Sequence, residues 1–259
     1  MSPPGGTATT SSPEQSPQQR RTALIAGVLF LLTFVTSIPA LFFYEPVLKH
    51  AGYILGAGAD ARVEVGAFLE VLLAIANVGT AVVLFPIVKR QNESIALGYV
   101  ASRILESTVI VVGLVSVLSV VALRQDLAGA AGSDTAALTA VGRSLVALHD
   151  QTFLLGPAFC AGIGNGILLG YLMFRSGLVP RGMAVLGLIG GPLAFATATA
   201  VLFGAYEQSS AASFVFTLPE ALWELSLGVY LTVKGFRPSP ILAPDSASAS
   251  APTAVAAAA

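Results

Sequence analysis

The sequence predicts an all-α fold, a polytopic membrane helix bundle with six transmembrane helices and both termini in the cytoplasm. Of its 259 residues, 55% are hydrophobic and only 10% are charged, whereas a typical soluble domain has roughly 25% charged residues. The apolar residues also fall into blocks of about 20, the length that a helix needs to cross about 30 Å of hydrocarbon. Both observations indicate a chain whose solvent is the lipid bilayer.

Six apolar blocks are long enough to span a bilayer, and each defines one predicted helix. They lie at about residues 23–44, 64–88, 95–123, 151–174, 183–206 and 214–234. The first block lacks a basic N-terminal segment and exceeds the apolar core of about 7 to 15 residues found in signal peptides. We therefore expect it to be a retained helix, and residues 20–237 to form one transmembrane domain.

The two ends of the chain differ in composition from this domain. Residues 1–19 are rich in Pro, Ser, Gly and Gln, and residues 238–259 are rich in Ala, Ser and Pro. Such segments bury too little apolar surface to offset the entropy of ordering. We expect both to be disordered tails.

The segment before the fourth block has a helical pattern of its own. In the stretch DTAALTAVGRSLVALHD, leucine and valine recur at helical spacing, and Asp134 is available as an N-cap. We expect this segment either to lie on the outer leaflet or to extend the fourth helix outward.

Small residues and prolines predict how the later helices pack. Gly162, Gly166 and Gly170 repeat every four residues, a stripe that lets two helices approach closely, with Asn165 in position to donate across the contact. Prolines inside apolar blocks kink or end helices. They occur at Pro39, Pro86, Pro157 and Pro192.

The loops carry an asymmetric distribution of Lys and Arg, which sets orientation because short basic loops stay in the cytoplasm. With the N-terminus inside, the inner segments hold Arg20, Arg21, Lys89, Arg90, Arg175, Arg181, Lys234 and Arg237. The outer segments hold Lys49, Arg62, Arg124 and Arg143. This distribution favours cytoplasmic termini.

Two opposite charges lie inside the third block. Arg103 and Glu106 are three residues apart, so they share a helix face and can pair. An ionised group at the centre of a membrane helix costs about 2.5 to 3.5 kcal/mol on insertion scales, which makes a partner necessary. One interpretation is a structural ion pair that joins neighbouring helices.

Further polar residues fall at similar depths in two other blocks. Glu220 and Glu224 lie one turn apart in the sixth block, and Glu70 and Asn77 lie on one face of the second. We expect all of them to turn inward as a polar column. The alternative is that Glu70 and Glu220 lie close enough to the outer interface to be hydrated.

The charges of this column do not balance. Arg103 is one cation against four carboxylates, at Glu70, Glu106, Glu220 and Glu224. A low-dielectric interior disfavours uncompensated charge, so some carboxylates must be protonated or a cation must join them. The column is therefore a candidate binding site for a proton, a cation or a small solute, and a cavity of about 300 Å³ or more lined by it would support a ligand.

Other features exclude or weaken several functional classes. The net charge of −1 lacks the basic patch that nucleic-acid binding requires, so we expect no nucleic-acid partner. Cys160 is a lone cysteine, and His50, His149 and Asp150 match no ligand spacing, so we expect neither a metal nor a cofactor and treat these as ordinary packing or interfacial residues. No GxSxG, HExxH or Walker motif occurs, and no catalytic residue is assigned.

Three stretches carry a resemblance: ESIALGYVASRILES, GYLMFRSGLVPRGMAVLGLIGG and LPEALWELSLGVYLTVKGF. Together they resemble the bacterial membrane-protein family catalogued as domain of unknown function 4386, over roughly residues 20–237. The family motif positions are occupied by Arg103, Glu106, Arg181, Glu224, Lys234 and Gly235. One departure is PRGM, where the family commonly has tryptophan after the Pro-Arg pair. The resemblance implies a multi-pass protein of the bacterial cytoplasmic membrane and implies no activity.

Three classes of function stay open. The first is binding or movement of a small solute, proton or cation through the carboxylates. The second is an interaction or regulatory membrane protein, in which the buried charges only specify helix packing. The third is a membrane enzyme acting on lipid or quinone with a carboxylate as acid or base, supported by the carboxylates alone.

Overall fold

The computed structural model describes residues 15–50, 52–56, 58–127 and 134–243. Within these residues the chain is helical and contains no strand. Six helices are long and apolar enough to cross a membrane, which confirms the predicted all-α polytopic bundle. The chain is a multi-pass membrane protein.

Five of the six spans are single α-helices: α1 (Pro17–Lys49), α2 (Asp60–Val88), α3 (Glu93–Asp126), α6 (Arg181–Leu202) and α7 (Ala211–Val233). The fourth span runs without interruption over Thr135–Ser176. It consists of α4 (Thr135–Phe153), η2 (Leu154–Cys160), η3 (Gly162–Leu169) and α5 (Gly170–Ser176). Two short 3-10 turns complete the described elements, η1 (Tyr53–Leu55) and η4 (Pro240–Leu242).

The bundle extends further into both predicted tails than the composition indicated. α1 begins at Pro17 because Ser16 and Gln19 form a reciprocal capping box. At the other end, the Ser239 hydroxyl donates to the Ser176 carbonyl at 2.5 Å, and the Gln19 amide donates to the Leu242 carbonyl at 2.8 Å. The remaining parts of the predicted tails, 1–14 and 244–259, lie outside the described residues.

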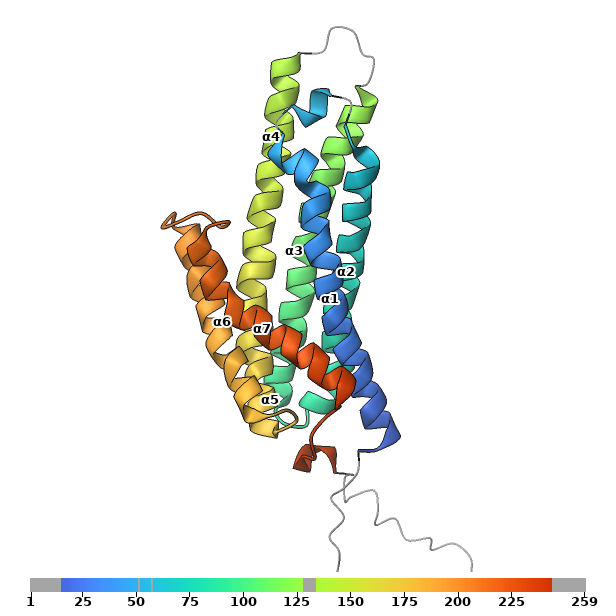
Figure 1. Cartoon of the computed structure of the whole chain (residues 1–259), viewed down its shortest axis with the longest axis vertical. Helices are drawn as coiled ribbons and strands as arrows, with labels where there is room; N and C mark the ends of the chain where they lie inside the picture. Colours follow the sequence, from blue (N-terminus) through green and yellow to red (C-terminus); the bar gives the residue numbers. More distant parts are fainter. Residues whose placement is uncertain (1–14, 51, 57, 128–133, 244–259) are drawn as a thin grey trace, which may run out of the picture.

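The segment before the fourth apolar block extends the fourth helix. The Asp134 carboxylate accepts from the backbone N–H groups of Ala136 and Ala137 at 3.0 and 3.2 Å, so it is the N-cap of α4. α4 then continues without a break into the apolar block. Figure 1 shows its first turns standing at the end of the molecule opposite the chain termini.

The middle of the fourth span is wound as π-helix rather than α-helix, over most of Leu154–Leu169. Pro157 lies in this segment and has no backbone N–H to donate to an α-helical turn. The glycine-rich stretch that follows tolerates the wider winding. The sequence predicted a kink here but not the change of winding. Because π turns are rare and are frequently found at functional sites, the interior side chains that this segment faces are candidates for such a site.

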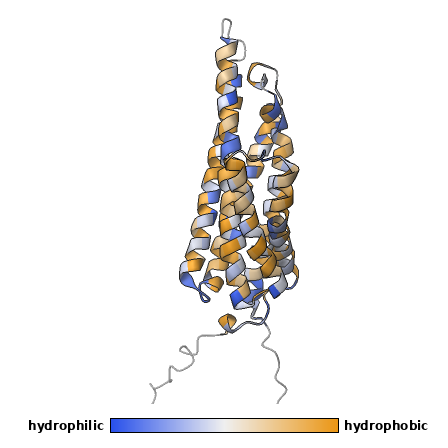
Figure 2. Ribbon diagram, turned by 90° about the vertical axis from the view of Figure 1, so that its left-hand side faces the viewer, coloured by the Kyte–Doolittle hydropathy of each residue, from blue (hydrophilic) through white to orange (hydrophobic). Residues whose placement is uncertain are grey.

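The helices form a long bundle, and a helical hairpin packs against one side of this bundle. α1 to α4 run side by side, and the α6–α7 hairpin crosses them (Figure 1), with α6 on η3 and α7 on α1. Both ends of the described chain lie at the same end of the bundle, as an even number of spans requires. Figure 2 shows hydrophobic residues covering the middle of the helices, as a lipid-facing surface requires.

The apolar core is divided into two clusters along the bundle axis. One, nearer the chain termini, includes Phe30 of α1, Leu84 of α2 and Tyr99 of α3. The other, at the far end, includes Tyr44 of α1 and Leu114 of α3. Between the two clusters, α1, α2 and α3 present polar side chains to the interior.

Candidate functional site

A cavity of about 310 Å³ occupies the gap between the two core clusters. Its walls come from α1, α2, α3, the fourth span, α6 and α7. The side chains proposed from the sequence all line it: Glu70, Asn77, Arg103, Glu106, Glu220 and Glu224. The structure therefore brings the acidic groups of three helices to one cavity, whose volume is at the lower end of those usual for ligand pockets.

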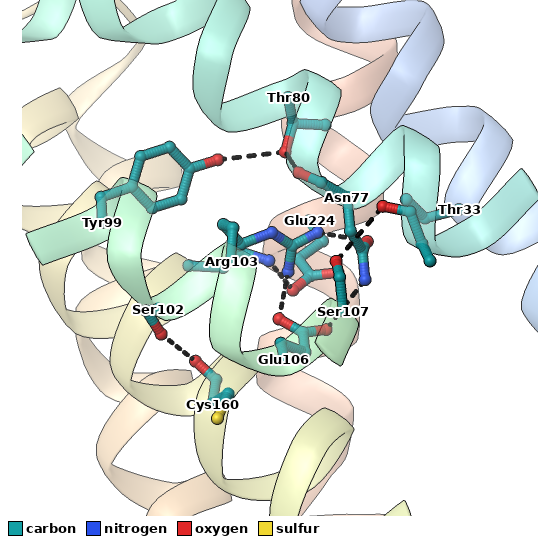
Figure 3. A network of polar contacts seen from close by, with 12 residues as sticks. Thr33, Asn77, Thr80, Tyr99, Ser102, Arg103, Glu106, Ser107, Cys160 and Glu224 are labelled. Carbon is teal, nitrogen blue, oxygen red and sulfur yellow. Dashed lines mark hydrogen bonds and ion pairs between the residues drawn. The ribbon is translucent and has the colours of Figure 1, made fainter. Parts of the chain in front are cut away.

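Arg103, Glu106 and Asn77 form a closed triangle of hydrogen bonds. Arg103 Nη1 donates to Glu106 Oε2 at 2.7 Å, Asn77 Nδ2 donates to Glu106 Oε1 at 3.2 Å, and Arg103 Nη2 donates to Asn77 Oδ1. Figure 3 shows these side chains of α2 and α3 turned toward one another, with Glu224 beside them. Arg103 is only 2% exposed, so it points inward and does not reach the headgroups.

Hydroxyl groups around the triangle join α2 to α3. Ser107 Oγ donates to the Ala74 carbonyl at 3.2 Å, and Thr80 Oγ1 donates to the Asn77 carbonyl at 2.7 Å. The Tyr99 hydroxyl in turn donates to Thr80 Oγ1 at 3.3 Å (Figure 3). Ser107 and Tyr99 of α3 thus bond to α2, and Thr80 bonds within α2. These contacts restrict the positions of Asn77 and Arg103.

Glu224 is held by the π-helical segment. Asn165 Nδ2 donates to Glu224 Oε1 at 2.5 Å, and the indole of Trp223 donates to the Asn165 carbonyl at 3.0 Å. The donation from Asn165 across the helix contact, predicted from the sequence, is thus confirmed.

Glu220 differs from the other carboxylates because no described residue satisfies it. It is 3% exposed, and neither of its carboxylate oxygens has a hydrogen-bond partner among the described residues. Glycines hold it in place: a Cβ built on Gly166 would lie 2.5 Å from Glu220 Oε2, and one built on Gly190 would lie 2.6 Å from the Glu220 nitrogen. Gly166 also approaches Gly191, which confirms the predicted close packing of the glycine stripe.

Glu70 lies on another part of the wall, with an aromatic partner. The Tyr44 hydroxyl donates to Glu70 Oε2 at 2.9 Å, and the Tyr44 ring meets the His149 ring edge-on with centroids 5.6 Å apart. Both Glu70 and Glu220 are buried on the cavity wall and are not exposed on the surface of the bundle.

His149 lines the cavity, although from the sequence we expected an ordinary packing or interfacial residue and did not assign it to the site. It is buried on the cavity wall, and its Nδ1 has no hydrogen-bond partner in the part of the chain that the structure describes. His50 and Asp150 line a separate hollow instead. Hydroxyl groups of the wall were also missed: Thr33, Ser37, Thr152 and Thr217. Their signal was weak, because Ser and Thr often bond to their own helix backbone.

The wall carries more negative than positive charge. Glu70, Glu106, Glu220 and Glu224 face the same cavity as Arg103, so full ionisation would leave about three negative charges without a fixed counter-charge. Within the described ranges, no three His, Cys, Asp or Glu side chains converge closely enough to hold a metal ion. The acidic groups are spread around the cavity.

Comparison with known proteins identifies the chain at the level of a family. Neither the curated proteins nor the solved structures contain a match. The family model described as "Domain of unknown function (DUF4386)" matches residues 25–235, nearly the whole helical bundle and close to the extent expected from the sequence motifs. The chain therefore belongs to the DUF4386 family.

Proposed function

We propose that this multi-pass membrane protein binds a small cation, a proton or a cationic solute in its central cavity and that it moves this ligand or responds to it. The observation that carries the proposal is Glu220, a buried carboxylate on the cavity wall whose two oxygens have no partner in the described chain. A buried, unsatisfied polar group is costly. A bound cation or proton removes that cost.

The surrounding charges support the same conclusion. Glu224 lies one turn from Glu220 and, among the described residues, accepts a hydrogen bond only from the neutral Asn165 amide, while Arg103 pairs directly with Glu106. Arg103 therefore does not balance the α7 carboxylates through direct contact. The electrostatic potential at this wall favours a positive guest.

The alternative function, in which charges only specify helix packing, fits part of the site. Arg103, Glu106 and Asn77 bond to one another, which is the arrangement expected of a structural ion pair. It does not account for Glu220, whose carboxylate makes no hydrogen bond within the described residues. We therefore regard the triangle as a rigid part of the wall of a binding cavity.

We place the protein in the cytoplasmic membrane with both termini in the cytoplasm. The eight inner and four outer Lys and Arg residues of the sequence support this orientation. Protease or tag accessibility at the two termini in intact cells tests it. Access from outside the cell would reverse the topology.

The binding proposal is tested with three variants of the full chain in lipid nanodiscs: Glu220→Gln, Glu224→Gln and the control Glu207→Gln. Glu207 is an exposed residue of the α6–α7 connection. Thermal unfolding is measured with a panel of inorganic and organic cations at several pH values, because a ligand that binds the folded state raises the unfolding temperature.

We expect the wild type and the Glu207→Gln variant to respond to a cation or to protons, and the two cavity variants to lose that response. A folded Glu220→Gln variant that responds like the wild type to every cation and pH would remove the basis of the proposal. Flux of the responding cation into sealed vesicles then separates transport from binding.

A further inference from the structure

The cavity is open on one side, between α1, the fourth span and α7. Two of its lining residues are exposed large apolar side chains, Leu41 at 44% and Phe153 at 36%, and a third lining residue, Thr217 of α7, is half-buried. α1 and α7 make at most marginal contact with η2. The opening therefore lies where α1 and α7, which pack against each other, separate from the fourth span.

This opening faces lipid. Leu41, Phe153 and Thr217 each lie inside a predicted transmembrane block, within three residues of its outer end. An exposed leucine and an exposed phenylalanine at that depth contact acyl chains near the headgroups. A molecule dissolved in this leaflet thus has a direct route into the cavity.

Along α7, polar groups lead from the opening inward. Thr217, Glu220 and Glu224 follow one another at spacings of three and four residues, so they share one helix face. At 1.5 Å per residue, Glu224 lies about 10 Å further along the helix than Thr217. A guest that enters at Thr217 meets the unpartnered carboxylate of Glu220 first.

The carboxylates are arranged for one cationic group. Glu70 accepts from Tyr44, Glu106 accepts from Arg103 and Asn77, and Glu224 accepts from Asn165. In the described part of the chain, Glu220 alone among the four has both oxygens free. It offers two acceptors at one point, which suits the N–H donors of a single ammonium group.

A metal ion fits the same geometry poorly. Calcium takes 6 to 8 oxygen ligands at about 2.3 to 2.6 Å, and magnesium demands a nearly ideal octahedron. The described side chains include no group of three His, Cys, Asp or Glu that converge on one point. The rest of the wall is largely apolar and includes Phe34, Leu73 and Ile110, which would pack against hydrocarbon.

We propose that the ligand is an amphiphilic ammonium ion, with one cationic nitrogen at Glu220 and an apolar body against the cavity wall, and that it enters from the bilayer past Leu41 and Phe153. This inference rests on the proposed function and specifies its substrate class. The cavity of about 310 Å³ accommodates a small body. A longer alkyl chain extends through the opening into the lipid.

The test uses octylammonium as the probe, with the full chain in nanodiscs and empty nanodiscs to correct for partitioning into lipid. Methylammonium has the charge without the apolar body, and octanol has the body without the charge. We expect octylammonium alone to bind saturably. Glu220→Gln should weaken it by at least about tenfold, the usual consequence of losing a charge-assisted hydrogen bond, whereas Glu207→Gln should leave it unchanged.

A second pair of variants tests the route without altering the carboxylates. Leu41→Trp fills the opening and should slow octylammonium binding at least about tenfold. Val35→Trp is the matched control, because Val35 is 65% exposed on the same helix and is not part of the cavity lining in the described structure. Equal association rates in the two variants would overturn the route through the bilayer.

The outcomes separate this inference from the proposed function. If methylammonium, sodium or protons give the Glu220-dependent response and octylammonium does not, the cavity binds cations but the amphiphile is wrong. If octanol binds as well as octylammonium, the charge has no role and the inference also fails. If no probe gives a Glu220-dependent response, both proposals fail together.

Discussion

Replacing Arg103 with methionine should destabilise the bundle far more than removing an exposed charge, because it leaves Glu106 without its cation in the protein interior. Arg103 and Glu106 are both buried, and their charged atoms are 2.7 Å apart. Removing one partner of a buried ion pair costs about 3 to 5 kcal/mol. Glu106→Gln should cost a similar amount, since it leaves the arginine unpaired.

The double variant Arg103→Met with Glu106→Gln should recover most of this loss. Both charges are then gone, and the remaining cost is the Asn77 oxygen, which loses the donor Arg103 Nη2. An unsatisfied buried acceptor costs about 1 to 3 kcal/mol. Two single changes of about 3 kcal/mol or more and a double change of about 3 kcal/mol or less give a coupling of at least about 3 kcal/mol.

The assay is denaturant unfolding in mixed micelles, followed by circular dichroism and by tryptophan fluorescence. The chain has a single tryptophan, Trp223, which is fully buried and donates to Asn165, so its emission reports packing beside the cavity. Lys49→Met is the control, because Lys49 pairs with Glu45 at the surface and such a pair contributes about 0 to 1 kcal/mol.

Two results would refute this reasoning. If Arg103→Met unfolds within about 1 kcal/mol of the wild type, the pair is not buried as described. If the double variant is as unstable as the sum of its parts, the two side chains act independently and the triangle is not one unit.

Two further predictions concern packing and pH. Gly166→Ala should lower the unfolding temperature and displace α7, because the new Cβ would collide with Gly191, whereas Gly182→Ala has open space and should have little effect in the same thermal assay. Near the far end of the bundle, Tyr53 donates to Asp60 at 2.6 Å, and burial, followed by this hydrogen bond and the carboxylate charge, raises the pKa of Tyr53 above its ordinary value. The unfolded phenol ionises near pH 10 and the folded one at a higher pH, so this stabilisation is complete below about pH 10 and is lost as the pH rises through the folded pKa. Tyr53→Phe should remove this contribution to the fall in unfolding free energy at alkaline pH. An identical fall in the variant would contradict the assignment.

The number and type of the helices followed from the sequence because the bilayer imposes simple rules. An apolar block of the right length must be helical, since no water is present to satisfy its backbone. The same rule turned the charges inward: Glu70, Glu106, Glu220 and Glu224 all line one cavity with Arg103, as the cost of exposing charge to lipid requires. The capping role of Asp134 could also be predicted from the sequence, because it depends on neighbours within three residues.

Other features depend on distances between segments that are remote in sequence. The close approach of Gly166 to Gly191 positions Glu220. No local sequence pattern specifies which residues of two helices pack against each other. The π winding of the fourth span was missed because proline and glycine predict a disturbance of a helix without its form. His149 was assigned to the interface, yet it is buried because α4 continues into the bundle.

The sequence by itself determined that this chain spans a membrane six times and that its acidic residues must turn away from lipid, because the free energy of inserting a segment depends on its own length and composition. Only the tertiary structure decided that the carboxylates surround a cavity and that both oxygens of Glu220 are left without a hydrogen-bond partner in the described chain. A void and its opening are properties of packing between helices, and packing is set by the shapes of all the contacting side chains together.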